Sequence, residues 1–315
     1  MSIITDELAF AAARVPIAAA IAAAKLAGRG DEKAADQAAV DAMRTALNAM
    51  PMQGRIVIGE GERDEAPMLY IGEEVGSGSG DALDIALDPL EGTTLTAKAM
   101  ANALAVIAFA PRGGMLHAPD TYMDKVAVGP GYEKNVVDLD APADENARAL
   151  AKAKGVKVED IGVCVLDRPR HAEIIAALRK SGCRVHLITD GDVAGVINCT
   201  KPETAIDMYV GQGGAPEGVL AAAALKCVGG QFQGRLVFRN DDERARADRA
   251  GVTDLNRRYD LGELVSKDAI FLATGVTPGS LLDGVRVQGG IASTHTLVLN
   301  SATRTISELR VRQPV

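Results

Sequence analysis

The order of apolar and polar positions along the chain predicts helices at the start and strands after them. The Ala-rich segment 8–27 and the segment 33–46 predict two helices. Gly28 is expected to end the first of them, and Asp31 to cap the second. A first strand is predicted at 55–58, where β-branched residues lead into an acidic loop. The chain therefore begins as a helical pair followed by a sheet.

The next apolar runs have the period of two that is typical of strands. Segment 82–88 predicts a strand with Asp84 and Asp88 on one face, since successive side chains point to opposite faces. Pro89 is expected to end that strand. A further buried strand is predicted at 104–110. This part of the chain thus brings two aspartates to one face of a sheet.

Strands and helices alternate through the second half of the chain. The predicted segments are 162–166, 171–180, 184–188, 193 onward, 205–210 and 216–226. This order predicts a mostly parallel sheet with helical crossovers. The charged stretch 239–258 mixes both signs, which favours a solvated helix face over a binding arm. Strands at 296–299 and 304–310 follow, so an α/β fold is expected, with domains at 1–157 and 158–315.

Charge and composition narrow the functional classes. Among the 315 residues, 47% are hydrophobic and the net charge is −8, which argues against a general nucleic-acid surface. The four cysteines form no CxxC pair, so zinc and redox spacings are absent and a reducing, cytoplasmic location is expected. Arg14, Pro16 and Lys25 interrupt the N-terminal apolar segment, so neither a membrane span nor a signal peptide is expected.

The chemistry concentrates in the ten residues 84–93. Asp88 ends the predicted strand, and Glu91 lies three residues further on, just before Gly92 and Thr93 begin a helix. Such a turn can aim two carboxylates and a backbone carbonyl at one point, where hard oxygen ligands suit Mg²⁺ or Mn²⁺. The N–H groups of the helix start suit a phosphate. This segment therefore predicts a metal and phosphate site.

The segment resembles the Asp-Pro-x-Asp-Gly-Ser/Thr signature of the lithium-sensitive, metal-dependent sugar and inositol phosphatases. In the variant found here, Glu91 replaces the second Asp, as is characteristic of class II fructose-1,6-bisphosphatases. The resemblance covers nearly the whole chain. Its other motifs are 28–31, 58–62, 66–70, 118–120, 190–192 and 213–218. It implies a layered αβαβα sugar-phosphatase sandwich with mixed sheets.

The resemblance also implies two divalent cations, Mn²⁺ or Mg²⁺. The implied ligands are Asp36, Glu60, Asp88, Glu91 and Glu217, with the Leu90 carbonyl as a further one. Two cations can activate water and stabilise both oxygens of an in-line displacement. Thr93 is expected to orient the water, with a plain helix N-cap as the other reading of this residue. By analogy with related phosphatases, Asp36 is expected to accept the proton.

A third set of residues is implied for the substrate. It comprises Glu91, Gly92, Thr93, Tyr122, Arg168, Pro169, Arg170, Asp190, Gly191, Asp192 and Gly214. The arginines and Tyr122 suit a distal phosphate, which arginine can bind bidentately. The family often has Lys-Pro-Arg where this chain has Arg168-Pro169-Arg170, so the charge is kept while the shape differs. His171 could lie near that phosphate or serve only at a helix start.

The implied activity is hydrolysis of the 1-phosphate of fructose-1,6-bisphosphate, in gluconeogenesis or the Calvin cycle. Sedoheptulose-1,7-bisphosphate is a second expected substrate, because it carries the same kind of terminal phosphates. The alternatives are an inositol-type phosphomonoesterase and a catalytically inactive phosphosugar-binding regulator. No nucleic-acid or membrane partner is expected. Because members of the family are commonly homo-oligomers, the resemblance implies a dimer or a tetramer.

Overall fold

The computed structural model describes residues 2–61 and 68–315, and their contacts form two compact units. Unit 1 consists of Met1–Leu116 and Val265–Val315, and unit 2 of His117–Leu264. The C-terminal strands thus belong with the N-terminal half, since they pair with strands that the first 116 residues supply. The predicted boundary near residue 157 coincides with neither edge of these units. Residues 62–67 of the acidic loop lie outside the described residues.

Unit 1 is built on a mixed sheet. Its described strands are β1 (Met52–Ile58), β2 (Glu74–Val75), β3 (Asp81–Glu91), β4 (Leu104–Pro111), β11 (Ile270–Gly275), β12 (Arg286–Gln288), β13 (Ile291–Asn300) and β14 (Thr305–Pro314). Their order is β12-β13-β11-β4-β3-β1-β2, with β14 also paired to β13. β1 and β3 are parallel, whereas β3, β4, β11 and β13 follow one another antiparallel. Strands from the N-terminal and C-terminal parts of the chain therefore lie in one sheet.

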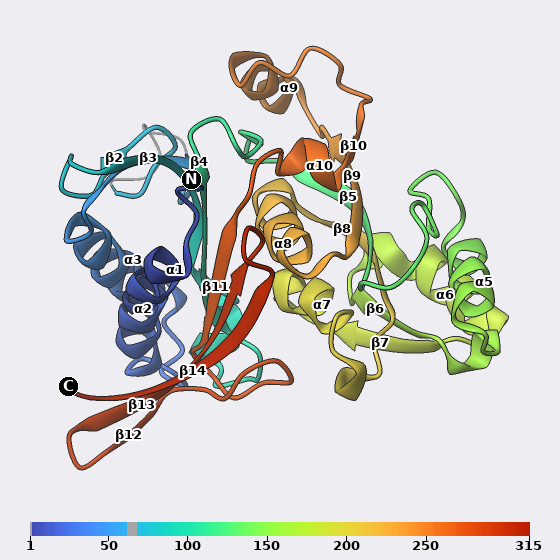
Figure 1. Ribbon diagram of the computed structural model, residues 1–315. Helices are drawn as coiled ribbons and strands as arrows, with labels where there is room; N and C mark the ends of the chain where they lie inside the picture. Colours follow the sequence, from blue (N-terminus) through green and yellow to red (C-terminus); the bar gives the residue numbers. More distant parts are fainter. Residues whose placement is uncertain (1, 62–67) are drawn as a thin grey trace. The chain divides into compact units, whose positions relative to one another are not determined.

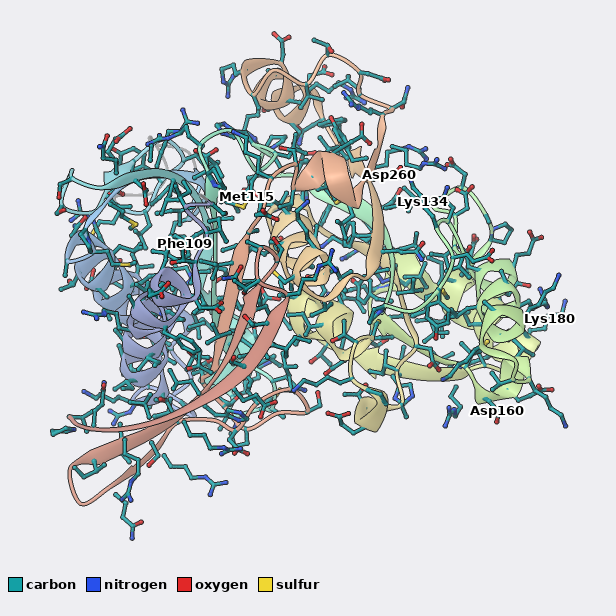
Figure 2. The ribbon with its side chains drawn as sticks, viewed as in Figure 1. Phe109, Met115, Lys134, Asp160, Lys180 and Asp260 are labelled. Atoms are coloured by element: carbon teal, nitrogen blue, oxygen red, sulfur yellow. The ribbon has the colours of Figure 1, made fainter. Side chains whose placement is uncertain are left out.

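Three helices cover one face of this sheet (Figure 1). The helices of unit 1 are α1 (Asp6–Ala12), α2 (Arg14–Ala24), α3 (Glu32–Asn48) and the short α4 (Thr93–Ala97). Phe109 on β4 belongs to the apolar core of this unit (Figure 2), together with Ile17 and Ile21 of α2. By length and composition alone, Asp6–Ala24 could cross a membrane, but more than half of this segment is buried in the unit's core, Phe10 being an exposed exception.

The single helix expected at 8–27 is two helices. Pro16 has no N–H group, and in an unbroken helix its ring would clash with the carbonyl four residues earlier, at Ala12, where α1 ends. Asp31 caps α3 as expected: its carboxylate accepts from the Ala34 N–H at 3.0 Å. The turn before α3 also contacts α4. The N–H groups of Gly28 and Gly30 donate to the Thr96 and Ala97 carbonyls and so hold the end of α4.

Unit 2 has a second mixed sheet, ordered β10-β9-β5-β8-β6-β7. Its strands are β5 (Tyr122–Val128), β6 (Gly162–Leu166), β7 (Arg184–Ile188), β8 (Met208–Gly214), β9 (Gln231–Val237) and β10 (Arg258–Asp260). Its α-helices are α5 (Ala143–Lys154), α6 (Ala172–Ser181), α7 (Asp192–Asn198), α8 (Ala215–Val228), α9 (Asp241–Arg249) and α10 (Leu261–Leu264). The 3₁₀ turns are η1 (Val158–Asp160), η2 (Pro169–His171) and η3 (Pro202–Thr204).

Helices cover both faces of this sheet (Figure 1). Val163 and Val165 of β6 pack in a core cluster with α5 and α6, while Cys164 between them lies under α7. The α/β class with mixed sheets is thereby confirmed. The expectation of a mostly parallel second sheet was wrong: among the described strands of this sheet, only β6 with β7 and β6 with β8 form parallel pairs.

The reason is the position of β5. β8 and β9 are joined by α8 and run in the same direction, as a helical crossover requires. β5 comes from earlier in the chain and lies between them, antiparallel to both. The alternation of strands and helices was therefore predicted correctly, but the insertion of β5 between β8 and β9 was not predicted.

Candidate active site

The Asp88–Glu91 segment forms a bulge at the end of β3. Asp88 lies opposite Val106 of β4 and Glu91 opposite Leu104, so β3 carries one extra residue at this point. Pro89 falls inside the bulge, where its missing N–H costs no ladder hydrogen bond. The strand continues to Glu91, and the expectation that Pro89 ends it was wrong. Pairing with β4 outweighs the local effect of the proline.

The bulge brings two carboxylates together. One oxygen of Asp88 and one of Glu91 lie within 4.8 Å of each other, and Glu91 is only 5% exposed. Asp88 also accepts from the Leu90 N–H at 2.9 Å, which fixes its side chain against the turn. Two like charges this close repel each other, and a divalent cation relieves the repulsion. The donor set is hard oxygen and fits Mg²⁺ or Mn²⁺.

The helix after the bulge begins at Thr93. Its N-cap is Gly92, whose φ of 87° is a left-handed conformation that suits glycine, and the cap has no side-chain hydrogen bond. Thr93 is therefore the first residue of α4 and not its N-cap. A cap alone does not account for this threonine.

The other predicted ligands of unit 1 lie on neighbouring elements. Asp36 is on α3, which packs against α4 and β3, and burial raises the pKa of its carboxyl. Within the described residues, no hydrogen bond or ion pair of the Asp36 carboxylate occurs. Glu60 follows β1, and its N–H donates to the Leu69 carbonyl at 3.0 Å. Gly59 permits that approach, because a Cβ there would lie 2.1 Å from the Leu69 oxygen.

Glu217 belongs to unit 2, in the first turn of α8. Its carboxylate folds back over the N-cap, Gly214, where a Cβ would lie 1.9 Å from a Glu217 oxygen. Gly214 therefore has a physical reason to lack a side chain. The structure thus groups Asp36, Glu60, Asp88, Leu90 and Glu91 within unit 1 and places Glu217 in unit 2.

The Asp190-Gly191-Asp192 turn lies at the start of α7. Gly191 has a φ of 80° and is the N-cap, and Asp190 accepts from its N–H at 3.1 Å. Asp192 is buried, and it accepts from Lys125 of β5 at 2.6 Å and from the Tyr209 hydroxyl at 3.2 Å. The sequence analysis missed Lys125, which is 1% exposed. Nothing local in the sequence pairs a β5 lysine with an aspartate 67 residues later.

Tyr122 and Arg170 come together in unit 2, with an arginine that the sequence analysis did not select. The Cζ atom of Arg170 lies 4.8 Å from the centre of the Tyr122 ring, and that of Arg239 lies 4.4 Å from it. Arg168 bonds elsewhere: its guanidinium donates to the backbone carbonyl of the preceding residue, Asp167, at 3.3 Å. We call Arg170, Tyr122 and Arg239 the arginine–tyrosine cluster.

Each arginine of the cluster is held by its own acceptor. Arg170 donates through Nε and Nη2 to the Gln212 carbonyl at 3.2 and 2.8 Å. Arg239 donates through Nε to Glu243 at 2.7 Å. Glu243 is 1% exposed; burial opposes its ionisation, but bonds from Arg239 and Thr121 outweigh this and lower the pKa. The stretch 239–258 does contain a helix, α9, yet its first turn supports this cluster.

His171 fixes the backbone that holds Arg170. Its Nε2 accepts from the Gln212 N–H at 2.8 Å, so Nδ1 carries the proton and donates to the Leu166 carbonyl at 2.7 Å. Both roles proposed for this residue have a basis, since it lies at the start of α6 and beside the cluster. Burial lowers the pKa of the imidazole.

Comparison with known proteins gives this arrangement a family. The family model described as bacterial fructose-1,6-bisphosphatase, glpX-encoded, matches residues 6–313. This chain belongs to that family. It is 46% identical to fructose-1,6-bisphosphatase 1 class 2 of Escherichia coli strain K12, over 96% of this chain and 94% of the relative. The same figures hold for the class 2 enzymes of E. coli O6:H1 and Shigella flexneri.

Membership accounts for the order of the motifs along the chain. The matched range contains the Asp88–Glu91 bulge, the 190–192 turn and the Gly213-Gly214 turn. The class II form of the bulge motif, with Glu91 as the second acid, agrees with the class of all three relatives. The resemblance inferred from those motifs is therefore confirmed.

The buried Lys125–Asp192 pair predicts a large stability effect. Lys125→Met leaves the Asp192 carboxylate buried without its cation, and we expect a loss of about 3–5 kcal/mol in the free energy of unfolding. Urea denaturation followed by circular dichroism measures it. The double variant Lys125→Met/Asp192→Asn should recover part of the loss, and exposed Lys180→Met should change little. A loss below about 1 kcal/mol for Lys125→Met would contradict the pairing.

His171 predicts a loss of stability in mild acid. The pKa of the folded imidazole lies below its ordinary value of 6.5, so below that pH the unfolded chain binds more protons and stability falls as pH falls. The urea midpoint should drop between pH 7.5 and 5.5, and drop less in His171→Gln. His186→Gln is the matched comparison, since burial also lowers the pKa of His186. Identical pH profiles for wild type and His171→Gln would exclude this role.

Proposed function

We propose that this protein is a fructose-1,6-bisphosphatase that hydrolyses the 1-phosphate to give fructose-6-phosphate and phosphate. The observation that carries the proposal is the Asp88–Glu91 carboxylate pair, held at a bulge in the class II motif of the matched family. Its relatives bear the name of this activity. Gluconeogenesis or the Calvin cycle would use it, in the cytoplasm and as a homo-oligomer, a dimer or a tetramer.

The proposed metal ligands are all oxygen donors. They are Asp36, Glu60, Asp88, the Leu90 carbonyl, Glu91 and Glu217. Bound Mn²⁺ or Mg²⁺ would supply an acidified water and stabilisation of the negative charge on the transferring phosphoryl group. The bulge supports this assignment, because it holds Asp88 and Glu91 close together before any cation arrives. Preorganised ligands save the cost of ordering them during binding.

The chain's own groups handle the water and its proton. Thr93 lies two residues after Glu91, just beyond Gly92, and its hydroxyl can accept one hydrogen bond while it donates another. We assign it the orientation of the attacking water. Asp36 is assigned the receipt of the proton, in addition to its metal role. Its half-buried carboxyl, with a raised pKa, is better suited to accept a proton than an ordinary exposed aspartate.

The arginine–tyrosine cluster supports the choice of a bisphosphate. Two guanidinium groups lie on one phenol ring. Glu243 balances the charge of Arg239, while Arg170 donates to a neutral carbonyl, so the cluster keeps a net positive charge that suits a phosphate. A monoester substrate has no second phosphate to occupy it. We therefore assign Tyr122 and Arg170 to the distal phosphate and add Arg239 to them. Arg168, the Asp190–Asp192 turn and Gly214 complete the proposed sugar-binding set.

Phosphate release from three substrates tests the function. Purified protein with Mn²⁺ or Mg²⁺, against a chelator control, is given fructose-1,6-bisphosphate, sedoheptulose-1,7-bisphosphate and inositol-1-phosphate. We expect metal-dependent release from fructose-1,6-bisphosphate, and release from the seven-carbon substrate would establish dual specificity. A preference for the monoester would favour an inositol-type enzyme instead. Binding without turnover would indicate a regulator.

Thr93→Ala should mainly lower kcat. Loss of the hydroxyl removes the group that orients the water, and we expect kcat to fall about 100-fold or more with KM nearly unchanged. Steady-state kinetics on fructose-1,6-bisphosphate measure both constants. Thr94→Ala, one residue later in the same short helix, is the matched control and should stay near wild type. A near-normal kcat in Thr93→Ala would remove its assigned role.

Arg170→Ala and Arg239→Ala should mainly raise KM. Each removes a charge-assisted contact to the distal phosphate, and we expect about a tenfold to hundredfold rise in KM for fructose-1,6-bisphosphate. Turnover of a sugar monophosphate that lacks the distal group should change far less. Arg244→Ala on α9, whose partner is exposed Asp241, serves as the control. An unchanged KM for either variant would remove that arginine from the site.

A further inference from the structure

A basic cavity of about 350 Å³ lies on the arm formed by β12, β13 and β14. Three arginines line it, Arg286 from β12 and Arg310 and Arg312 from β14. Two strands, β11 and β4, separate β13 from β3 in the sheet order, so the cavity is a different place from the Asp88–Glu91 bulge. Nothing in the proposed hydrolysis uses it.

Strand register explains why the arginines converge. Arg286 pairs with Ser293, and Ser293 pairs on its other side with Arg312, so the three side chains form one row on one face. The Cα atoms of the two arginines are about 10 Å apart, because each strand spacing is about 4.8 Å. Two residues along β13, His295 pairs with Arg310 and belongs to the same face. Ser293 is thus the middle residue of this row, between the two arginines.

The charges of this face are only partly balanced. Arg310 donates to Asp283 at 2.5 Å, and the Glu308 carboxylate lies 3.2 Å from His295 Nε2. His295 Nδ1 accepts from the Asp283 N–H at 3.1 Å. In the part of the chain that the structure describes, neither Arg286 nor Arg312 has a carboxylate within 4.0 Å.

Two like charges on the same face of a sheet repel each other, and an anion bound between them relieves that repulsion. Here Arg286 and Arg312 flank a single serine, on a chain whose net charge is −8. The guanidinium fork matches phosphate oxygens bidentately, and the serine hydroxyl can donate a further bond. The volume is at the small end of the range for small-molecule pockets. This size favours a small, compact ligand over a macromolecule.

We propose that this cavity binds a small phosphorylated metabolite, with its phosphate held by Arg286 and Arg312 over the Ser293 hydroxyl. Arg310 and Asp283 form one wall and set the position of the arm. The site is independent of the proposed hydrolysis, and its ligand needs no carbon skeleton in common with a sugar bisphosphate.

Phosphate titration tests the proposal in the full-length chain. Inorganic phosphate and pyrophosphate are the probes, measured by isothermal titration calorimetry with chelator present. The variant Arg170→Ala/Arg239→Ala is the background, so that the arginine–tyrosine cluster adds no binding. Adding Arg286→Ala or Arg312→Ala should weaken the remaining binding at least tenfold. Both side chains are exposed, so the strands should fold normally, and circular dichroism checks this.

Matched variants separate a phosphate fork from general charge. Arg286→Lys keeps the charge but loses the fork, and should recover only part of the affinity. Arg304→Ala, an exposed arginine in the turn between β13 and β14, should leave binding unchanged. Equal binding in the background, Arg286→Ala and Arg312→Ala proteins would overturn the proposal. So would a change of oligomeric state in sedimentation without loss of phosphate binding, because the arm would then bind a second copy.

Discussion

Two carboxylates held side by side at a bulge in a buried strand set the main electrostatic constraint on unit 1. The backbone at Asp88 and Glu91 is held by β4, since both residues have register partners there, while the pairing of β3 with β1 reaches as far as Ala86. The bulge tolerates Pro89 and turns both acids toward one point. Everything proposed for catalysis depends on this rigidity. A loop with the same residues could relax by separating the charges, whereas in the paired strand a bound cation relieves the repulsion without moving the backbone.

In unit 2, two carboxylates lie close against the backbone of a glycine turn. Gly213 and Gly214 lie where a Cβ would collide with the carboxylates of Asp192 and Glu217, so these two positions admit no larger residue without rearrangement. The buried bond between Asp192 and Lys125 then fixes the start of α7 against β5. Because that pair is desolvated, its loss costs far more than that of the exposed ion pairs elsewhere on the unit.

Charge distribution connects the two proposals. An acidic chain repels its phosphorylated ligands at long range, so binding requires local positive charge. The structure supplies it with arginines in fixed positions: the arginine–tyrosine cluster in unit 2 and the β12–β14 cavity in unit 1. Arginine suits both places, because its planar fork keeps its charge and matches phosphate geometry. Cation–π contacts with Tyr122 position the arginines of the cluster, and strand register positions those of the cavity.

Local sequence determined most of the elements. The strands at 162–166 and 184–188 have the bounds that their apolar runs predicted, and Asp31 caps its helix, because these features depend on neighbours in the chain. The acidic motif at 84–93 likewise identified the family without any structure. Long-range pairing decided the rest. No local pattern indicates that β5 enters between β8 and β9.

The same limit applies to the candidate site. Sequence motifs selected Tyr122 and Arg170, but Arg239 stood in a charged stretch whose composition indicated only a solvated helix. Its role appears when β9 and β5 pair and bring Arg239 beside Tyr122. Arg286 and Arg312 are 26 positions apart in the sequence and become neighbours only through Ser293. Register decides which side chains meet across strands, and a single segment does not reveal its partner strand or its register.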